Sequence, residues 1–125
     1  MMDDTRAREL LAQSEEIYSA AEVQAALQRV AHEINGKLAG QHPLVLSVMG
    51  GAVVFSGQLL PLLDFPLDFD YLHVSRYGNA QQGGALHWKV APREKVRGRV
   101  VLVLDDILDE GETLHAIRQR VQELA

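Results

Sequence analysis

The chain has 125 residues, of which 47% are apolar and 23% charged, and these proportions are typical of a folded globular protein. It contains no cysteine, which excludes a disulfide framework, a thiolate zinc site and a cysteine nucleophile. Its formal net charge of −5 argues against binding to duplex nucleic acid. No apolar run approaches the roughly 20 residues of a membrane span, and the acidic N-terminus does not resemble a secretory signal, so we expect a cytoplasmic location without membrane contact.

The first third of the chain is predicted to be helical. Apolar residues in the range 3–39 recur mostly at spacings of three, four or seven, as the buried face of a helix requires. Ser19-Ala20-Ala21-Glu22 has the form of a capping box, which predicts that a second helix begins near Ala20. Gly36 provides a stop signal for that helix.

The period then changes to that of buried strands. A short apolar run at 43–49, followed by Gly50-Gly51, predicts a strand of a parallel sheet. Residues 52–63 are apolar enough for a packed helix, and residues 67–75 predict a second strand. Gly, Asn and Gln in the range 78–84 indicate a loop.

The last part of the chain repeats the pattern of strand and helix. A short strand is predicted at 85–90, a charged turn at 92–98, the strongest strand at 99–104 and a helix at 112–124. The resulting order of helices and strands predicts an α/β protein with a mostly parallel sheet. The first and last parallel strands should be neighbours, with a ligand at the switch point between them.

The segment 100–114 carries the most chemical information, because five apolar residues lead directly into a cluster of acids and a turn before a helix. Asp105 and Asp106 can accept hydrogen bonds from a ribose diol, directly or through Mg²⁺ and water. Backbone N–H groups of the turn at 110–113 can bind a phosphate, Gly111 permits a positive φ, and Thr113 adds a hydroxyl. Taken singly, these residue types also occur at helix starts and strand ends that bind nothing.

Other catalytic patterns are missing from the sequence. The five histidines show no metal-ligand spacing, and no Walker A motif is present. Ser47 and Ser56 lie outside any G-x-S-x-G pattern, which argues against a serine hydrolase.

Taken together, residues 100–114 resemble the ribose-phosphate signature of the type I phosphoribosyltransferases, and they are most similar to the hypoxanthine-guanine branch. Residues 46–60 resemble the pyrophosphate loop and following helix of that branch. Residues 65–77 resemble the strand that enters its flexible catalytic loop. The three blocks are collinear and cover about residues 44–114, so the resemblance rests on ordered motifs rather than on one pattern.

The resemblance implies a role for each matching residue. Asp105 and Asp106 would hold the ribose hydroxyls of phosphoribosyl pyrophosphate (PRPP) and help to order Mg²⁺. Asp109 would lie near N7 of the purine as the general base, or would hold the N7 proton. The remaining implied roles are 5′-phosphate binding by Glu110, Gly111, Glu112 and Thr113, pyrophosphate contact by Gly50 and Gly51, and closure of the site by Arg76 and Tyr77.

The sequence also departs from the family pattern. Glu112 stands where relatives often have Lys. Relatives continue after the last helix with two more strands that carry base recognition and a further Mg²⁺-binding Asp, whereas this sequence ends at Ala125. We therefore expect a C-terminally truncated chain, with the strand at 99–104 at a bare sheet edge.

These observations lead to one reading and two alternatives. We expect a single three-layer α/β/α domain over residues 1–125, with a helical hood segment at 1–39 and a core at 40–125. The implied activity is purine salvage: transfer of the 5-phosphoribosyl group from PRPP to hypoxanthine or guanine, which gives IMP or GMP and pyrophosphate. Mg²⁺ is the implied cofactor, and a homodimer or homotetramer the expected assembly. The alternatives are a non-catalytic PRPP- or nucleotide-binding module and an unstable half-domain without activity.

Overall fold

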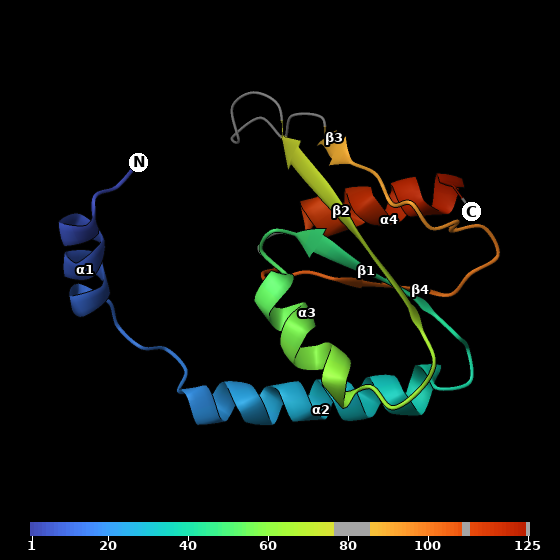
Figure 1. Ribbon diagram of the computed structural model, residues 1–125, viewed down its shortest axis with the longest axis horizontal. Coiled ribbons are helices and arrows are strands. Elements are labelled where there is room, and N and C mark those ends of the chain that lie inside the picture. Colours follow the sequence, from blue (N-terminus) through green and yellow to red (C-terminus); the bar gives the residue numbers. More distant parts are fainter. Residues whose placement is uncertain (77–85, 109–110, 125) are drawn as a thin grey trace.

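Four strands form one mixed sheet in the part of the chain that the computed structural model describes, which is residues 1–76, 86–108 and 111–124. The strand order is β3-β2-β1-β4 (Figure 1). β1 is parallel to both β2 and β4, and β3 is antiparallel to β2. This confirms the mostly parallel sheet and the β1–β4 neighbours. The strands are β1 (Leu44–Met49), β2 (Asp68–Arg76), β3 (Leu86–Val90) and β4 (Val101–Leu104).

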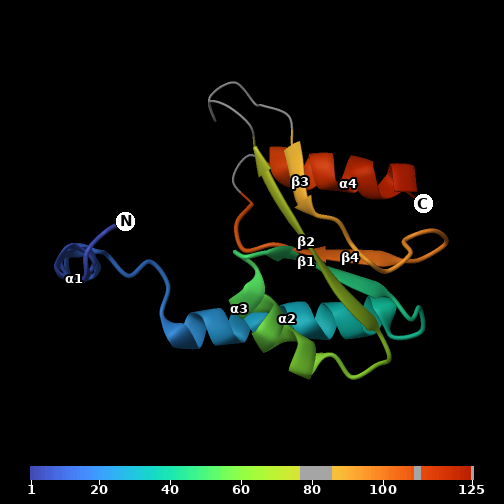
Figure 2. The same ribbon diagram turned by 45° about the horizontal axis from the view of Figure 1, so that its top comes forward.

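Helices cover both faces of this sheet, which confirms the three-layer arrangement. α2 (Ala20–Leu38) and α3 (Val53–Leu59) lie on one face, and α4 (Glu112–Leu124) lies on the other (Figure 2). α1 (Asp4–Gln13) stands apart and buries none of its residues, so the expected contribution of residues 3–39 to one face comes from α2. No helix in the described ranges has the length and apolar character to span a membrane.

Most predicted elements occur close to their expected bounds. The capping box is present, because the Ser19 hydroxyl accepts a hydrogen bond from the Glu22 N–H at 3.1 Å and the Glu22 carboxylate accepts one from the Ser19 N–H at 3.0 Å. The helix predicted at 52–63 instead consists of α3 and a short 3₁₀ helix, Leu60–Leu62. Pro61 explains the change, since it has no N–H to continue an α-helix. The loop predicted at 78–84 lies outside the described residues.

The buried strand β1 explains the continuous apolar run in the sequence, because its alternate side chains fill two separate cores. Leu44, Leu46 and Val48 pack with side chains of β2 and α4. Val45 packs with side chains of α2 and α3 on the other face. Ser47 points to the same side as Val45, where its hydroxyl lies 2.7 Å from that of Ser56 in α3.

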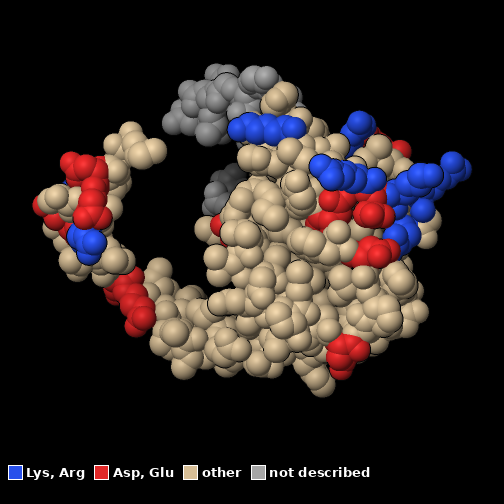
Figure 3. Space-filling view, viewed as in Figure 1, with Lys and Arg blue, Asp and Glu red and all other residues tan. Residues whose placement is uncertain are grey.

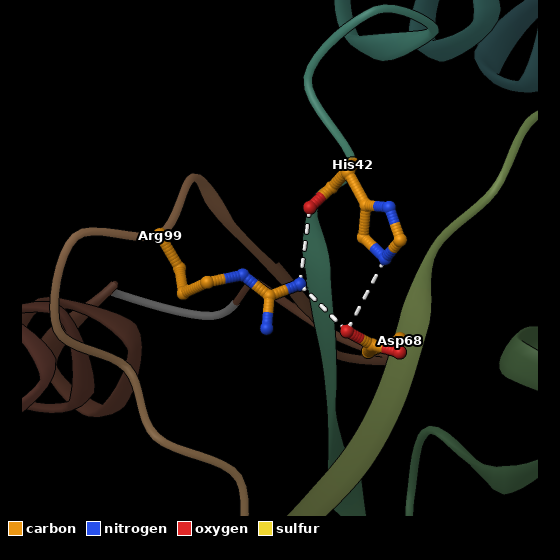
Figure 4. Close-up of polar contacts among 3 residues, drawn as sticks. All are labelled: His42, Asp68 and Arg99. Carbon is orange, nitrogen blue, oxygen red and sulfur yellow. Dashed lines mark hydrogen bonds and ion pairs between the residues drawn. The ribbon is translucent and has the colours of Figure 1, made fainter.

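An ion-pair cluster joins the first residue of β2 to the segments just before β1 and β4 (Figure 4). The Arg99 guanidinium donates to the His42 carbonyl at 3.0 Å and to the Asp68 carboxylate at 2.9 Å. His42 Nε2 lies 3.3 Å from the same carboxylate oxygen. The hydrogen bond from Arg99 lowers the pKa of Asp68 despite some desolvation. Because the cluster lies at the amino ends of these strands, we assign it a structural role.

A buried carboxylate, Asp70, attaches the turn before β4 to strand β2. Its side chain is only 8% exposed and accepts backbone N–H bonds from Tyr71 at 2.8 Å, Arg93 at 2.5 Å and Glu94 at 2.8 Å. We expect Asp70→Ala to lower the free energy of unfolding by about 2–3 kcal/mol in urea titrations at neutral pH, because buried N–H groups lose their acceptor. Asp64→Ala, at an exposed acid, should change it by less than about 0.5 kcal/mol.

The same contacts give the effect of Asp70 a defined pH dependence. Burial by itself raises the pKa of Asp70, but the three N–H donors outweigh burial and lower the pKa overall. The stability that the carboxylate provides is therefore complete above its unfolded pKa of about 4 and is lost as the pH falls through the lower folded value. The difference between wild type and Asp70→Ala should shrink over that acidic window; a constant difference would contradict this account.

Candidate functional site

The carboxyl ends of β1 and β4 bring two of the predicted motifs together. The strands pair in parallel, with Ser47 opposite Leu104, so the glycine turn after β1 and the acids after β4 emerge at the same edge of the sheet. Gly51 and Asp106 are in close contact: a Cβ atom at Gly51 would lie only 2.6 Å from Asp106 Oδ2. The absence of a side chain at Gly51 thus makes room for the Asp106 carboxylate.

The glycine turn leads directly into α3. The Gly50 carbonyl accepts a hydrogen bond from the Val53 N–H at 3.2 Å, and the Val48 carbonyl accepts one from Ala52 at 3.0 Å. The Met49–Gly50 peptide bond is cis, which no feature of the sequence indicated. A Cβ atom at Gly50 would meet nothing within 4 Å, so this residue faces open space at the edge of the site.

The acidic pair after β4 is held by its own backbone. Asp105 Oδ1 accepts the Asp106 N–H at 2.8 Å, and Asp106 Oδ1 accepts the Ile107 N–H at 2.9 Å. Asp105 is half-buried, whereas Asp106 is exposed. Burial raises the pKa of Asp105, and the neighbouring Asp106 carboxylate adds to the rise against the opposing backbone hydrogen bond. The ionised pair therefore favours binding of a cation or of hydrogen-bond donors.

Neutralising Asp105 is expected to stabilise the free protein. The pKa of Asp105 is higher in the folded protein than in the unfolded chain. The free energy of unfolding therefore falls as the pH rises from the unfolded to the folded pKa, and the full loss of stability is reached at neutral pH. Asp105→Asn should raise the free energy of unfolding by up to about 1 kcal/mol at pH 7, as measured in urea titrations. The gain should disappear near pH 3, where residue 105 is uncharged in the wild type as well as in the variant. Asp64→Asn, at an exposed acid, is the control and should show no gain at either pH.

Gly111, just before α4, has the positive φ that the sequence analysis allowed for it. Gly111 has a φ of 80°, in the left-handed region, and its carbonyl accepts the His115 N–H at 2.9 Å. Glu112 is exposed at the first position of α4, and Thr113 follows it half-buried. Arg76 is the last residue of β2. The predicted site residues Tyr77, Asp109 and Glu110 lie outside the described residues.

A hollow next to the acidic pair was missed by the sequence analysis. It measures about 410 Å³ and is bounded by Gly51, Asp105 and Asp106 on one side and by α2 and α3 on the other. Its helical walls include Val23, Val30, Val54, Phe55 and Gln58. The available signal was the apolar periodicity of α2, but periodicity alone does not distinguish a fully packed face from one that borders a hollow.

The site offers a donor set for one hard cation. The described residues contain no group of three or more His, Asp or Glu side chains that could hold a metal by themselves. Asp105 and Asp106 supply neighbouring carboxylate oxygens, and Mg²⁺ is commonly held by one or two carboxylates together with water and substrate phosphates. The pair therefore fits Mg²⁺ that arrives with a phosphorylated ligand.

A glycine turn, an acidic pair and a helix start at the carboxyl ends of parallel strands form the arrangement with which many α/β proteins bind phosphorylated ligands. The model of the phosphoribosyl transferase domain family matches residues 13–123, and the chain belongs to this family. The resemblance noted in the sequence is thereby confirmed.

Relatives with assigned names agree with this family. The chain is 31% identical over 106 residues to a hypoxanthine-guanine-xanthine phosphoribosyltransferase of Tritrichomonas foetus, covering 85% of this chain and 58% of that protein. It is 27% identical over 103 residues to a hypoxanthine-guanine phosphoribosyltransferase of Streptococcus pneumoniae, covering 82% and 57%. The chain thus spans somewhat less than 60% of the length of these two relatives.

Solved structures share the fold. A hypoxanthine phosphoribosyltransferase of Staphylococcus aureus superimposes with a TM-score of 0.83 at 20% identity, over 98% of this chain and 66% of that one. A hypoxanthine-guanine-xanthine phosphoribosyltransferase superimposes with a TM-score of 0.79 at 28% identity, over 89% and 62%.

Proposed function

We propose that this protein transfers the 5-phosphoribosyl group of PRPP to hypoxanthine or guanine, which gives IMP or GMP and pyrophosphate. The observation that carries the proposal is the contact between Gly51 and the Asp106 carboxylate, because it joins the pyrophosphate motif to the ribose motif at one sheet edge. Membership of the family and the names of the relatives support the same activity. We further propose a cytoplasmic homodimer or homotetramer.

In this proposal, different residues bind the ribose, the 5′-phosphate and the pyrophosphate of PRPP. Asp105 and Asp106 accept hydrogen bonds from the ribose hydroxyls, and their carboxylates fit Mg²⁺. Main-chain N–H groups at 110–113 hold the 5′-phosphate at the start of α4. Gly50 and Gly51 let the backbone approach the pyrophosphate closely. When bound, Mg²⁺ supplies positive charge that offsets the charge of the pyrophosphate.

The reaction exchanges one bond at the anomeric carbon for another. The bond from this carbon to the pyrophosphate oxygen breaks, and the pyrophosphate leaves with that electron pair. A purine ring nitrogen forms the new bond, while Asp109 takes or holds the N7 proton. Arg76 and Tyr77 close over the site and exclude water from the oxocarbenium-like transition state.

A second candidate is a module that binds PRPP or a nucleotide without turnover. It is supported by the described site residues, because Gly51, Asp105 and Asp106 are assigned to the pyrophosphate and ribose of PRPP and none of them to the purine base. This candidate uses the same ribose and phosphate contacts and differs only in the absence of base transfer.

One experiment separates the two candidates. The full chain is assayed spectrophotometrically with Mg²⁺, PRPP and, separately, hypoxanthine, guanine, xanthine and adenine, while its melting temperature is recorded with and without Mg²⁺-PRPP. Turnover with hypoxanthine or guanine supports the transferase. A higher melting temperature without turnover supports the binding module. If the chain shows no turnover and its melting temperature does not change with Mg²⁺-PRPP, both candidate functions are contradicted.

The acidic pair provides the matched test of the binding site. Asp105→Ala/Asp106→Ala should weaken PRPP binding by about 100-fold or more in calorimetric titrations, because two charged acceptors are lost. The control Glu33→Ala/Asp64→Ala removes the same charge at exposed positions and should bind PRPP normally. Equal affinities in the two variants would rule out the assigned ribose site.

A further inference from the structure

The N-terminal arm, residues 1–18, presents apolar side chains that its own chain leaves uncovered. No residue of α1 is buried, and both ribbon views show α1 separated from the sheet and its covering helices (Figures 1 and 2). Leu11 is 76% exposed, Ile17 80% and Tyr18 68%. Such a group of large exposed apolar side chains is typical of a surface that another molecule covers.

The arm also carries unneutralised negative charge next to these apolar groups. On α1, Arg8 pairs with Asp4 at 2.8 Å and Arg6 pairs with Glu9 at 3.4 Å, so those charges offset one another. Glu15 and Glu16 follow α1 and form no ion pair among the described residues. The segment 15–18 is therefore acidic at one end and apolar at the other.

A complementary surface lies at the opposite end of the molecule. The range 89–99 contains Lys89, Arg93, Lys95, Arg97 and Arg99 but only one acid, Glu94, although the whole chain has a net charge of −5. Figure 3 shows Lys and Arg side chains gathered at the end of the molecule that lies far from α1.

Within this region is a pocket of about 400 Å³, here called the cationic pocket, between the turn at 91–97 and the C-terminal end of α4. Its apolar walls include Trp88, Pro92 and Leu124. Its charged lining consists of the acid Glu94 and three cations, Lys95, Arg97 and Arg120. Arg120 pairs with Glu123, whereas Lys95 and Arg97 form no ion pair within the described ranges. The pocket thus combines an apolar wall with two available cations, which matches the composition of segment 15–18.

The arm points away from the cationic pocket of its own chain. α1 and the C-terminal end of α4 lie at opposite ends of the longest axis of the molecule (Figure 1). The six residues 14–19 that connect α1 to α2 span at most about 20 Å. A second copy of this chain carries a pocket whose charge and apolar wall complement the arm.

We propose that the arm of one copy docks into the cationic pocket of a second copy. Glu15 and Glu16 pair with Lys95 and Arg97, and the side chains of Ile17 and Tyr18 cover the apolar wall that includes Trp88. A reciprocal exchange of arms about a two-fold axis uses both arms and both pockets, and so closes the assembly as a dimer. This proposal is independent of the phosphoribosyl chemistry, since none of its residues belongs to the PRPP site.

Sedimentation velocity with a concentration series of the full-length protein tests the exchange through charge reversal. Wild type should dimerise, and E15K/E16K and K95E/R97E should each weaken dimerisation by about tenfold or more, because like charges then face each other. The variant with all four substitutions should recover the wild-type dimer constant to within about threefold, since the complementary charges are restored with opposite signs.

Matched controls identify the surface. K37E/R118E changes the net charge by the same amount at exposed residues outside the pocket and should dimerise like wild type. Three outcomes would each overturn the proposed exchange of arms. They are a monomeric wild type, normal dimerisation of both charge-reversal variants, and failure of the variant with all four substitutions to recover dimerisation.

A second measurement keeps the test decisive if a reversal impairs folding. Raising sodium chloride from about 50 to 500 mM should weaken the wild-type dimer several-fold without any substitution, because salt screens partly exposed ion pairs. A salt-independent dimer constant would overturn the assigned charge pairing, and circular dichroism melts establish which variants are folded.

Discussion

Replacing Asp109 with Asn is expected to lower kcat with hypoxanthine or guanine by about 100- to 10,000-fold, the usual contribution of a general acid or base. The amide keeps the size of the carboxylate but cannot take up the N7 proton of the purine. PRPP affinity should change by less than about threefold, because ribose and phosphate binding is assigned to other residues. Steady-state kinetics and calorimetric titration of PRPP measure the two quantities separately.

The pH dependence adds a readout that a structural role would not alter. If Asp109 is the base, the acidic limb of the kcat/KM profile of wild type reports its protonation, and this limb should be lost in Asp109→Asn. Asp64→Asn makes the same chemical change at an exposed acid and should keep both the rate and the profile. A wild-type rate in Asp109→Asn would remove Asp109 from the proposed mechanism.

Adding a single methyl group at Gly51 is expected to disrupt the ribose site. The new Cβ atom would lie 2.6 to 2.8 Å from the Cγ, Oδ1 and Oδ2 atoms of Asp106, closer than such atoms approach in proteins. Asp106 is short, and its Oδ1 holds the Ile107 N–H at 2.9 Å, so the carboxylate must turn away and lose this bond. Gly51→Ala should therefore weaken PRPP binding by about tenfold or more.

A double-mutant cycle shows whether the effect passes through Asp106. Once Asp106 is replaced by Ala, the Gly51→Ala change should cost little further PRPP affinity, because the clashing carboxylate is already gone. Gly50→Ala is the steric control for stability, since a Cβ atom there meets nothing within 4 Å and the melting temperature should be unchanged. Fully additive effects of Gly51→Ala and Asp106→Ala would show that the two residues act separately.

The sequence by itself determined the elements whose causes are local. The apolar run at 43–49 predicted β1, the Ser19–Glu22 capping box predicted the start of α2, and the predicted range 112–124 coincides with α4. These predictions succeeded because periodicity and capping depend on residues within a few positions of one another. The ordered motifs at 46–60 and 100–114 likewise indicated the family, since each is contiguous in the chain.

The sequence analysis also predicted that β1 and β4 are neighbours, but the tertiary structure alone decided which of their flanking side chains meet. The contact between Gly51 and Asp106 joins residues 55 positions apart, and it exists because β1 pairs directly with β4. Three other features also depend on segments that are distant in the sequence. They are the hydrogen bond from Arg99 to Asp68, the hollow bounded by α2, α3 and the acidic pair, and the separation of α1 from the core. The physical reason is that strand order and helix packing depend on burial of the whole apolar surface, and a local window of sequence does not contain that information.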